Sequence, residues 1–252
     1  MLKVRIIPTL LFKDFGLVKG VGFDSWRRVG SAMQAVKVYN MREVDELVFL
    51  DITATRDGRP PDFATVDEIA DECFMPLAVG GGVRSVEDAR SLLQVGADKV
   101  VLGTAAVESP DLIREVAARF GSQCAVISID FRRIGPGVRR VFTHCGTTGT
   151  DLDPVEFAKQ AQRSGAGEIL LQSIERDGTM SGYDIETIRA VTDAVSIPVI
   201  ASGGAGNYEH LAEAVLDGRA AAVAAASIFH FTQQTPREAK EHLGQRGIPV
   251  RR

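Results

Sequence analysis

Short apolar runs alternate with amphipathic stretches along the whole chain. Eight runs have the continuous apolar character of parallel strands that are covered on both faces; they span residues 4–11, 47–53, 77–81, 99–103, 125–130, 168–174, 198–202 and 221–226. Helical patterns lie between them at 31–42, 63–73, 86–95, 110–119, 154–164, 185–194, 207–216 and 236–245. Eight strand–helix alternations predict a (β/α)8 barrel, or TIM barrel. A doubly wound sheet is the alternative, but it rarely reaches eight regular units without a second domain.

Local signals mark three of the helix starts. Ser85, Ser109 and Asp153 stand just before predicted helices, where a side-chain oxygen can accept hydrogen bonds from the first turn. Pro110 and Pro154 then fall at the first helical position, where an N–H group is not needed. These residues predict where the three helices begin.

The second half of the chain repeats the first. Segment 67–109 parallels segment 186–229: each has a helix, a strand that opens at a proline, a glycine cluster, a helix ending in glycine, and a strand of small residues. The repeat predicts a barrel built from two fused half-barrels, and we expect one domain over residues 1–252.

The same alignment compares the strand ends of the two halves. It sets Asp51 against Ser173, and Leu11 against Asp130. One half therefore has an acid at this strand end, where barrel enzymes carry their chemistry, and the other half has a leucine.

Composition and charge exclude several classes of function. The 252 residues have a formal net charge of −4, which gives no electrostatic reason to expect nucleic acid or an anionic membrane as a partner. No apolar run approaches the roughly 20 residues of a membrane span, and the N-terminus lacks a signal-peptide cleavage site, so we expect a cytoplasmic protein. Neither the three cysteines nor the four histidines have ligand spacing, and we expect no metal and no cofactor.

Each half carries a glycine cluster directly after a strand. Residues 80–82 form the first cluster and residues 202–204 the second, and each is followed by a strand that ends in small residues. Glycines let backbone amides approach an anion, which predicts one phosphate site in each half. Tight turns are the plain alternative, but the symmetric placement favours phosphate. The residues expected at the two sites are Gly81, Gly82, Thr104, Gly203, Gly204, Ala226 and Ser227.

After the two glycine clusters, the loop at 173–184 is a third segment that could contact a ligand. It carries Glu175, Asp177 and a run of small residues, and we expect it to order over a ligand, with Asp177 and the Gly178 amide near the second phosphate. The sequence Arg-Asp-Gly is also ordinary turn chemistry, which is the alternative explanation.

Long motifs give the chain a family resemblance. They include RIIP, DELVFLDITA, VGGGV, GADKV, GAGEILL and IPVIASGGAG, in this order along nearly the whole chain. These motifs resemble the HisF family, the cyclase subunit of imidazole glycerol phosphate synthase. The resemblance implies a lyase of histidine biosynthesis. Such a barrel takes ammonia from a glutaminase docked at its N-terminal face, and uses it to cleave and cyclise a bis-phosphorylated ribonucleotide.

The resemblance also implies roles for residues at the N-terminal face. Arg5, Glu46, Lys99 and Glu168 match a charged ring at the barrel floor that gates ammonia entry, and Asp98 matches an aspartate that faces the glutaminase. Four charges near a barrel axis would be unfavourable unless they paired. A salt-bridge plug that only closes the barrel is the plainer explanation for them.

At the opposite face, further residues match the catalytic machinery. Asp130 matches one of the family's two catalytic acids, and Lys19 matches a lysine of a mobile loop. Asp51, Thr104 and Asp177 match polar residues around the active-site mouth.

The chain departs from the family pattern at this same face. Leu11 stands where the second catalytic aspartate belongs, and leucine can neither donate nor accept a proton. Gly103 replaces Asn, Gln172 replaces Thr, Glu175 replaces Asp, and the loop at 144–153 lacks the expected lysines. The pattern indicates that ammonia handling is kept and the substrate chemistry altered.

Other motifs resemble a paralogous branch more closely. IPTLLFKDFGLVK, ECFMPLAVGGG, THCGTTGTDLDPVEFAKQ and SIERDGTMSGYD look like HisF-like proteins of bacterial surface-polysaccharide (lipopolysaccharide, O-antigen) biosynthesis. This resemblance implies two partners, a HisH-like glutaminase and an N-acetyl sugar amidotransferase. With these partners the barrel would supply ammonia to convert an acetamido group of a sugar into an acetamidino group. The glycine clusters add the expectation of a phosphorylated small molecule as a further ligand.

Three functional hypotheses follow. The first is an ammonia-channelling subunit of a glutamine amidotransferase complex for sugar amidination. The second is a genuine cyclase, with Asp130 acting alone or with a neighbour such as Asp14 in place of the missing acid. The third is a scaffold without catalysis, which holds the glutaminase and the sugar amidotransferase together.

Overall fold

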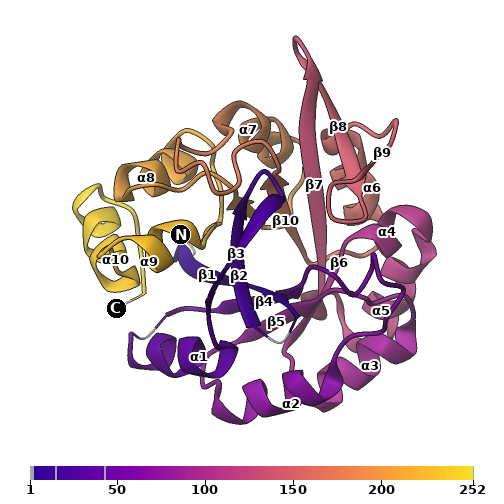
Figure 1. The fold of residues 1–252 in the computed structure, drawn as a ribbon. Helices are drawn as coiled ribbons and strands as arrows, with labels where there is room; N and C mark the ends of the chain where they lie inside the picture. The colour runs from indigo at the N-terminus through magenta and orange to yellow at the C-terminus, as the bar shows by residue number, and fades with distance from the viewer. Residues whose placement is uncertain (1–2, 15, 43, 252) are drawn as a thin grey trace.

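Eight parallel strands close into a barrel (Figure 1). The computed structural model describes residues 3–14, 16–42 and 44–251. The barrel strands are β1 (Arg5–Lys13), β4 (Leu47–Asp51), β5 (Leu77–Gly80), β6 (Lys99–Leu102), β7 (Ala125–Gly135), β10 (Glu168–Ser173), β11 (Val199–Ser202) and β12 (Ala222–Ala225). The sheet is closed because β12 pairs with β1 and β10 pairs with both β7 and β11. The predicted (β/α)8 barrel is therefore confirmed.

Helices cover the outside of the barrel and bury their apolar stripes against it. They are α1 (Ala32–Met41), α2 (Phe63–Glu72), α3 (Val86–Gln94), α5 (Asp111–Phe120), α6 (Pro154–Arg163), α7 (Ile185–Ala194), α8 (Tyr208–Leu216) and α10 (Pro236–Gln245). Each lies within two residues of its predicted range. No helix among the residues described is long and apolar enough to cross a membrane.

Two of the three predicted helix caps are confirmed. Ser85 accepts a hydrogen bond from the Asp88 amide, and Asp153 caps the helix that Pro154 opens. The Ser109 prediction is wrong. Ser109 ends a short helix, α4 (Thr104–Glu108), so Pro110 takes the N-cap position of α5 and no side chain caps that helix.

The sequence pattern missed two antiparallel hairpins and several short elements. β2 (Gly16–Val21) and β3 (Asp24–Gly30) form a hairpin where the sequence analysis expected a loop. β7 extends beyond the barrel to pair with β8 (Val138–Thr143), which in turn pairs with β9 (Thr148–Gly149). The other missed elements are α4, α9 (Ser227–Phe231) and the 3-10 turn η1 (Ser122–Cys124).

The sheet register agrees with the alignment of the two halves. Leu11 on β1 pairs with Leu50 on the next strand, and Asp130 on β7 pairs with Gln172 on its next strand. Both β1 and β7 then continue into an antiparallel hairpin. Leu11 and Asp130 therefore occupy corresponding positions. The next pairs along are Phe12–Asp51 and Phe131–Ser173.

The barrel interior is layered. Four charged side chains lie where β1, β4, β6 and β10 begin, and we call them the floor cluster: Arg5, Glu46, Lys99 and Glu168. Two residues further along the same strands comes the apolar layer: Ile7, Val48, Val101 and Leu170, which pack with inward residues of the other strands. Above this layer, the carboxyl ends of the strands surround a cavity.

Candidate functional site

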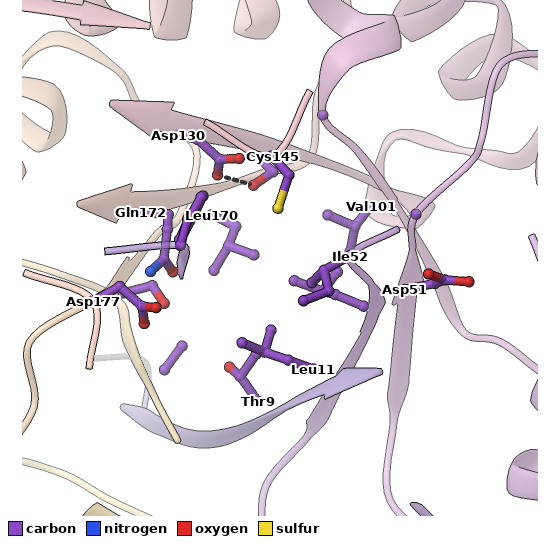
Figure 2. A pocket seen from close by; sticks show the side chains of 18 of the residues that line it. Thr9, Leu11, Asp51, Ile52, Val101, Asp130, Cys145, Leu170, Gln172 and Asp177 are labelled. Carbon is purple, nitrogen blue, oxygen red and sulfur yellow. Dashed lines mark hydrogen bonds between the residues drawn. The ribbon is translucent and has the colours of Figure 1, made fainter. Parts of the chain in front are cut away.

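A cavity of about 210 Å³ opens at the carboxyl ends of the barrel strands (Figure 2). This is the end at which barrel enzymes place their active sites. The structure brings together at this cavity the residues predicted for catalysis and phosphate binding: Lys19, Gly81, Gly82, Thr104, Asp130, Asp177, Gly178, Gly203, Gly204, Ala226 and Ser227. Leu11, at the position of the missing acid, also lines it.

Asp130 supplies a titratable carboxyl group to the cavity. Its Oδ1 accepts a hydrogen bond from Ser128 Oγ at 3.0 Å (Figure 2). The pKa of Asp130 is raised to about 6, mainly by burial and to a smaller extent by the negative charge of Asp177, while the Ser128 hydrogen bond acts in the opposite direction. The group can therefore hold and release a proton close to neutral pH.

The wall contributed by β1 carries no carboxylate. Figure 2 shows Leu11 and Thr9 across the cavity from Asp130. Leu11 is buried, and Leu50 and Ile52 from β4 and the residue after it line the same cavity. The first half of the barrel therefore offers no acid at the position that corresponds to Asp130.

The β2–β3 hairpin forms another wall and is held by a buried ion pair. Lys19 Nζ lies 2.6 Å from Asp177 Oδ1, and the Lys19 side chain is only 2 % exposed. The Gly22 amide donates to the Asp177 carbonyl oxygen at 2.9 Å. The hairpin also packs closely on the loop after β10, because a Cβ added to Gly178 would lie 2.1 Å from the Gly20 oxygen. Lys19 is therefore on a paired, docked strand and not on the open loop that the sequence analysis expected.

Several buried polar atoms at the cavity have no hydrogen-bond partner. Among the residues described, these include Thr9 Oγ1, Asp177 Oδ2 and Ser227 Oγ. Buried polar groups are normally satisfied, so residues at this cavity retain hydrogen-bonding capacity that the protein itself does not use.

The glycine clusters lie at the cavity, but local packing also requires them. Gly81 and Gly204 have φ angles of +102° and +112°, which favour glycine. A Cβ on Gly81 would lie 2.1 Å from the Asp51 oxygen, and one on Gly204 would lie 2.1 Å from the Gly182 oxygen. Tight packing alone accounts for these two glycines, so phosphate binding at the clusters stays a prediction.

Asp51 lines the cavity, but its carboxylate binds groups of the segment that follows β4. Its Oδ1 accepts hydrogen bonds from the amides of Thr53 and Ala54 at 2.9 and 3.0 Å, and Arg59 lies 3.3 Å from Oδ2. Figure 2 shows the carboxylate turned away from the centre of the cavity. Asp51 therefore stabilises the segment after β4.

Two other carboxylates lie away from the cavity. Glu175 is exposed and accepts a hydrogen bond from the Arg133 amide at 3.2 Å. The Asp14 side chain is 76 % exposed, lies beside Lys13, and does not line the cavity. The hypothesis that Asp14 replaces the missing acid is not supported by this position.

Two residues that were not predicted, His144 and Cys145, line the cavity from the turn between β8 and β9. Both have left-handed backbones, with φ angles of +51° and +56°, and the His144 amide donates to Thr104 Oγ1 at 2.9 Å. Burial raises the pKa of the Cys145 thiol to about 12, so this thiol stays protonated and is a poor nucleophile. The sequence placed the loop at 144–153 at this face, but no signal singled out either residue within it.

At the other end of the barrel, the floor cluster forms a closed set of ion pairs. Arg5 lies 2.6 Å from Glu46 and 2.7 Å from Glu168, and Lys99 lies 2.9 and 2.8 Å from the same two carboxylates. Each charge therefore has two opposite neighbours. The structure brings together all four residues that the sequence analysis grouped.

The surface around the floor cluster is apolar in places. Phe74 and Met41 are 84 % and 77 % exposed and line one groove, together with the partly exposed Val250. Asp98, directly before Lys99, is exposed at this face, and its Oδ2 accepts a hydrogen bond from the Leu77 amide at 2.8 Å. Exposed large apolar side chains of this kind mark interaction surfaces.

The described residues contain no group of three or more histidine, cysteine, aspartate or glutamate side chains that could hold a metal ion.

In the comparison with known families, a sequence model described as "Histidine biosynthesis protein" matches residues 5–235 of this chain.

Proposed function

Since this chain belongs to the histidine biosynthesis protein family, we propose that it is the ammonia-channelling subunit of a glutamine amidotransferase complex. In this proposal a HisH-like glutaminase releases ammonia at the floor of the barrel. An N-acetyl sugar amidotransferase uses the ammonia to convert an acetamido group of a surface-polysaccharide sugar into an acetamidino group. The barrel itself performs little chemistry.

One contrast within the barrel carries the proposal. The floor cluster is complete, with every charge paired, whereas the acid pair at the cavity is reduced to Asp130 because Leu11 occupies the corresponding position. General acid–base catalysis with two carboxylates is lost when one of them becomes leucine. The floor cluster, which keeps all four charges, lies at the end of the barrel at which ammonia would enter.

The barrel interior between the floor cluster and the cavity favours passage of an uncharged molecule. Ile7, Val48, Val101 and Leu170 separate the floor cluster from the cavity, and burying an unpaired ion among them would be strongly unfavourable. Neutral ammonia is small and carries no such penalty. The apolar layer therefore favours ammonia over ammonium.

The groove beside the floor cluster supports a glutaminase partner at this face. Phe74 and Met41 expose apolar surface next to the strand beginnings, and Asp98 adds a carboxylate. Apolar anchors with a polar surround are the usual composition of a protein interface. The docked glutaminase would then release its product directly over Arg5 and Lys99.

We further propose that the cavity holds a phosphorylated ligand that acts as an effector of the complex. The unsatisfied Ser227 Oγ and Thr9 Oγ1 can donate hydrogen bonds, and the glycine clusters add backbone amides at the same cavity. Lys19 supplies a positive charge, although in this structure it is paired with Asp177.

The proposal is tested by reconstituting the barrel with the glutaminase, the amidotransferase and the N-acetyl sugar substrate. Lys99→Ala should reduce product formation with glutamine, while product formation with free ammonium stays at the wild-type level. Lys159→Ala, on the exposed face of α6, is the matched control and should change neither. Unchanged glutamine dependence in Lys99→Ala would favour a scaffold role instead.

A genuine cyclase is the second candidate, because the pKa of Asp130 near 6 leaves one competent acid. It is tested by mixing the barrel with its glutaminase and the bis-phosphorylated ribonucleotide, and following the loss of substrate absorbance. Robust formation of imidazole glycerol phosphate would overturn the first proposal.

A further inference from the structure

The β7–β8 hairpin projects beyond the barrel at the carboxyl ends of the strands (Figure 1). Its turn lies at 136–137, and two apolar side chains beside this turn, Ile134 and Val138, are 56 % and 38 % exposed. Four of the nine residues at 132–140 are arginines, although the chain as a whole has a net charge of −4. The hairpin is therefore a local basic and apolar projection on an acidic protein.

The arginines are arranged as two like-charged pairs across the hairpin. Arg133 lies directly opposite Arg139, and Arg132 lies directly opposite Arg140. Like charges that face each other across two strands destabilise the hairpin, unless another group compensates for them. The two pairs differ in this respect.

The pair Arg133–Arg139 is compensated from within the chain. Both guanidinium groups contact Glu186 on α7, at 3.2 and 2.6 Å, and both lie within 3.9 Å of Asp184. These ion pairs fix the part of the hairpin nearer its turn against the start of α7, and they account for two of the four arginines.

The pair Arg132–Arg140 has no such compensation. The Arg132 guanidinium lies 5.0 Å from the centre of the Phe142 ring, and Arg140 Nη1 donates to the Arg139 carbonyl oxygen at 2.9 Å. In the part of the chain that the structure describes, no carboxylate lies within ion-pair distance of either group. Arg132 is two positions along β7 from Asp130, so this pair extends the strand face that lines the cavity.

From this arrangement we infer that the β7–β8 hairpin is the docking site for the enzyme that consumes the ammonia, through an acidic patch on that enzyme. This inference rests on the proposed function. Ammonia that crosses the barrel leaves at the carboxyl ends of the strands, where the hairpin stands. Carboxylates of the partner would neutralise Arg132 and Arg140, and Ile134 would enter an apolar depression beside them. Arginine and large apolar side chains are frequent anchors of protein interfaces.

The test measures binding of immobilised N-acetyl sugar amidotransferase to the full-length barrel, at several salt concentrations. Arg132→Glu/Arg140→Glu should weaken binding at least tenfold, and the wild-type association rate should fall as salt rises. The control is Arg90→Glu/Arg114→Glu, which makes the same change in charge on the exposed faces of α3 and α5 and should bind like the wild type. Two milder variants, Arg132→Gln/Arg140→Gln and Ile134→Ser, guard against misfolding and should each weaken binding.

The outcomes separate the inference from the proposed function. If the wild type binds and supports glutamine-dependent amidination, but all hairpin variants match the control, the docking site is wrong and the proposed function stands. If the wild type neither binds nor supports amidination, the proposed function fails and the inference fails with it. Free uridine diphosphate is the last probe. If it binds the wild type but not the arginine variants, while binding of the amidotransferase is undiminished, the pair recognises a small anion and the inference is overturned.

Discussion

The buried pair between Lys19 and Asp177 makes a sharp prediction, because it holds the β2–β3 hairpin over the cavity. Lys19→Met keeps most of the side-chain volume and removes the charge. Asp177 would then be left with both carboxylate oxygens unsatisfied, since its Oδ2 already has no partner. The hairpin should respond by undocking, which returns Asp177 to water.

The size of the effect follows from the burial of both groups. The side chains are 2 % and 9 % exposed, and removal of one partner of such a pair typically destabilises a protein by about 3–5 kcal/mol. Opening of the hairpin limits this loss, because the barrel strands beneath it do not depend on the pair. We therefore expect local opening with a smaller change in the global free energy of unfolding.

Trp26 provides the assay, since it is the single tryptophan and lies on β3 at the cavity. In Lys19→Met its fluorescence emission should shift to the red and be quenched more strongly by acrylamide, while the far-UV circular dichroism of the barrel stays close to that of the wild type. Lys19→Met/Asp177→Leu, which replaces both charges by apolar groups, should restore the wild-type emission. Emission and quenching identical to the wild type in Lys19→Met would refute the argument that this pair docks the hairpin.

Three further predictions concern the floor cluster and the two positions that correspond between the halves. Lys99→Met leaves Arg5 as the shared cation of Glu46 and Glu168, and it should destabilise the barrel by about 3 kcal/mol. Calorimetry should show a melting temperature lowered by about 6–12 °C. A melting temperature equal to that of the wild type would contradict the view that the four charges of the floor cluster depend on one another. For Asp130, burial raises the folded-state pKa to about 6 from 3.8, so its contribution to stability is full below about pH 3.8 and is lost as the pH rises through 6. Urea unfolding should accordingly show the wild type losing up to about 3 kcal/mol relative to Asp130→Asn between pH 4 and pH 7, and a constant difference would contradict the raised pKa. Leu11→Asp should raise imidazole glycerol phosphate formation about 100-fold from its near-zero level in the reconstituted enzyme; no change would mean that the other departures at this face matter as much as the missing acid.

The barrel was predictable because its signals are local. A buried parallel strand needs a continuous apolar run, and an amphipathic helix needs a stripe of period 3.6, so each element can be identified without knowledge of its neighbours. The hairpins were not predictable in this way. β3 is exposed along most of its length and has no apolar run, and its position depends on pairing with β2 and on contacts with the loop after β10.

The sequence predicted which residues belong to the candidate site better than it predicted the contacts that these residues make. The family resemblance grouped the floor cluster correctly, because four charged residues at strand beginnings must meet near the barrel axis. It could not show that Lys19 is paired with Asp177, since that contact joins residues 158 positions apart. His144 and Cys145 reach the cavity through a turn with a left-handed backbone, and nothing in their side-chain types indicates such a conformation.

The layered interior has one further consequence, which is clearest if the barrel is compared with a lipid bilayer. The floor cluster and the cavity correspond to the two polar surfaces of the bilayer. The apolar layer of Ile7, Val48, Val101 and Leu170 corresponds to the hydrocarbon region between them. Like a bilayer, such a layer dissolves small neutral molecules better than ions. A permeant that arrives protonated must leave its proton at the floor, so the flux through the barrel would follow the neutral fraction on the entry side and rise with pH.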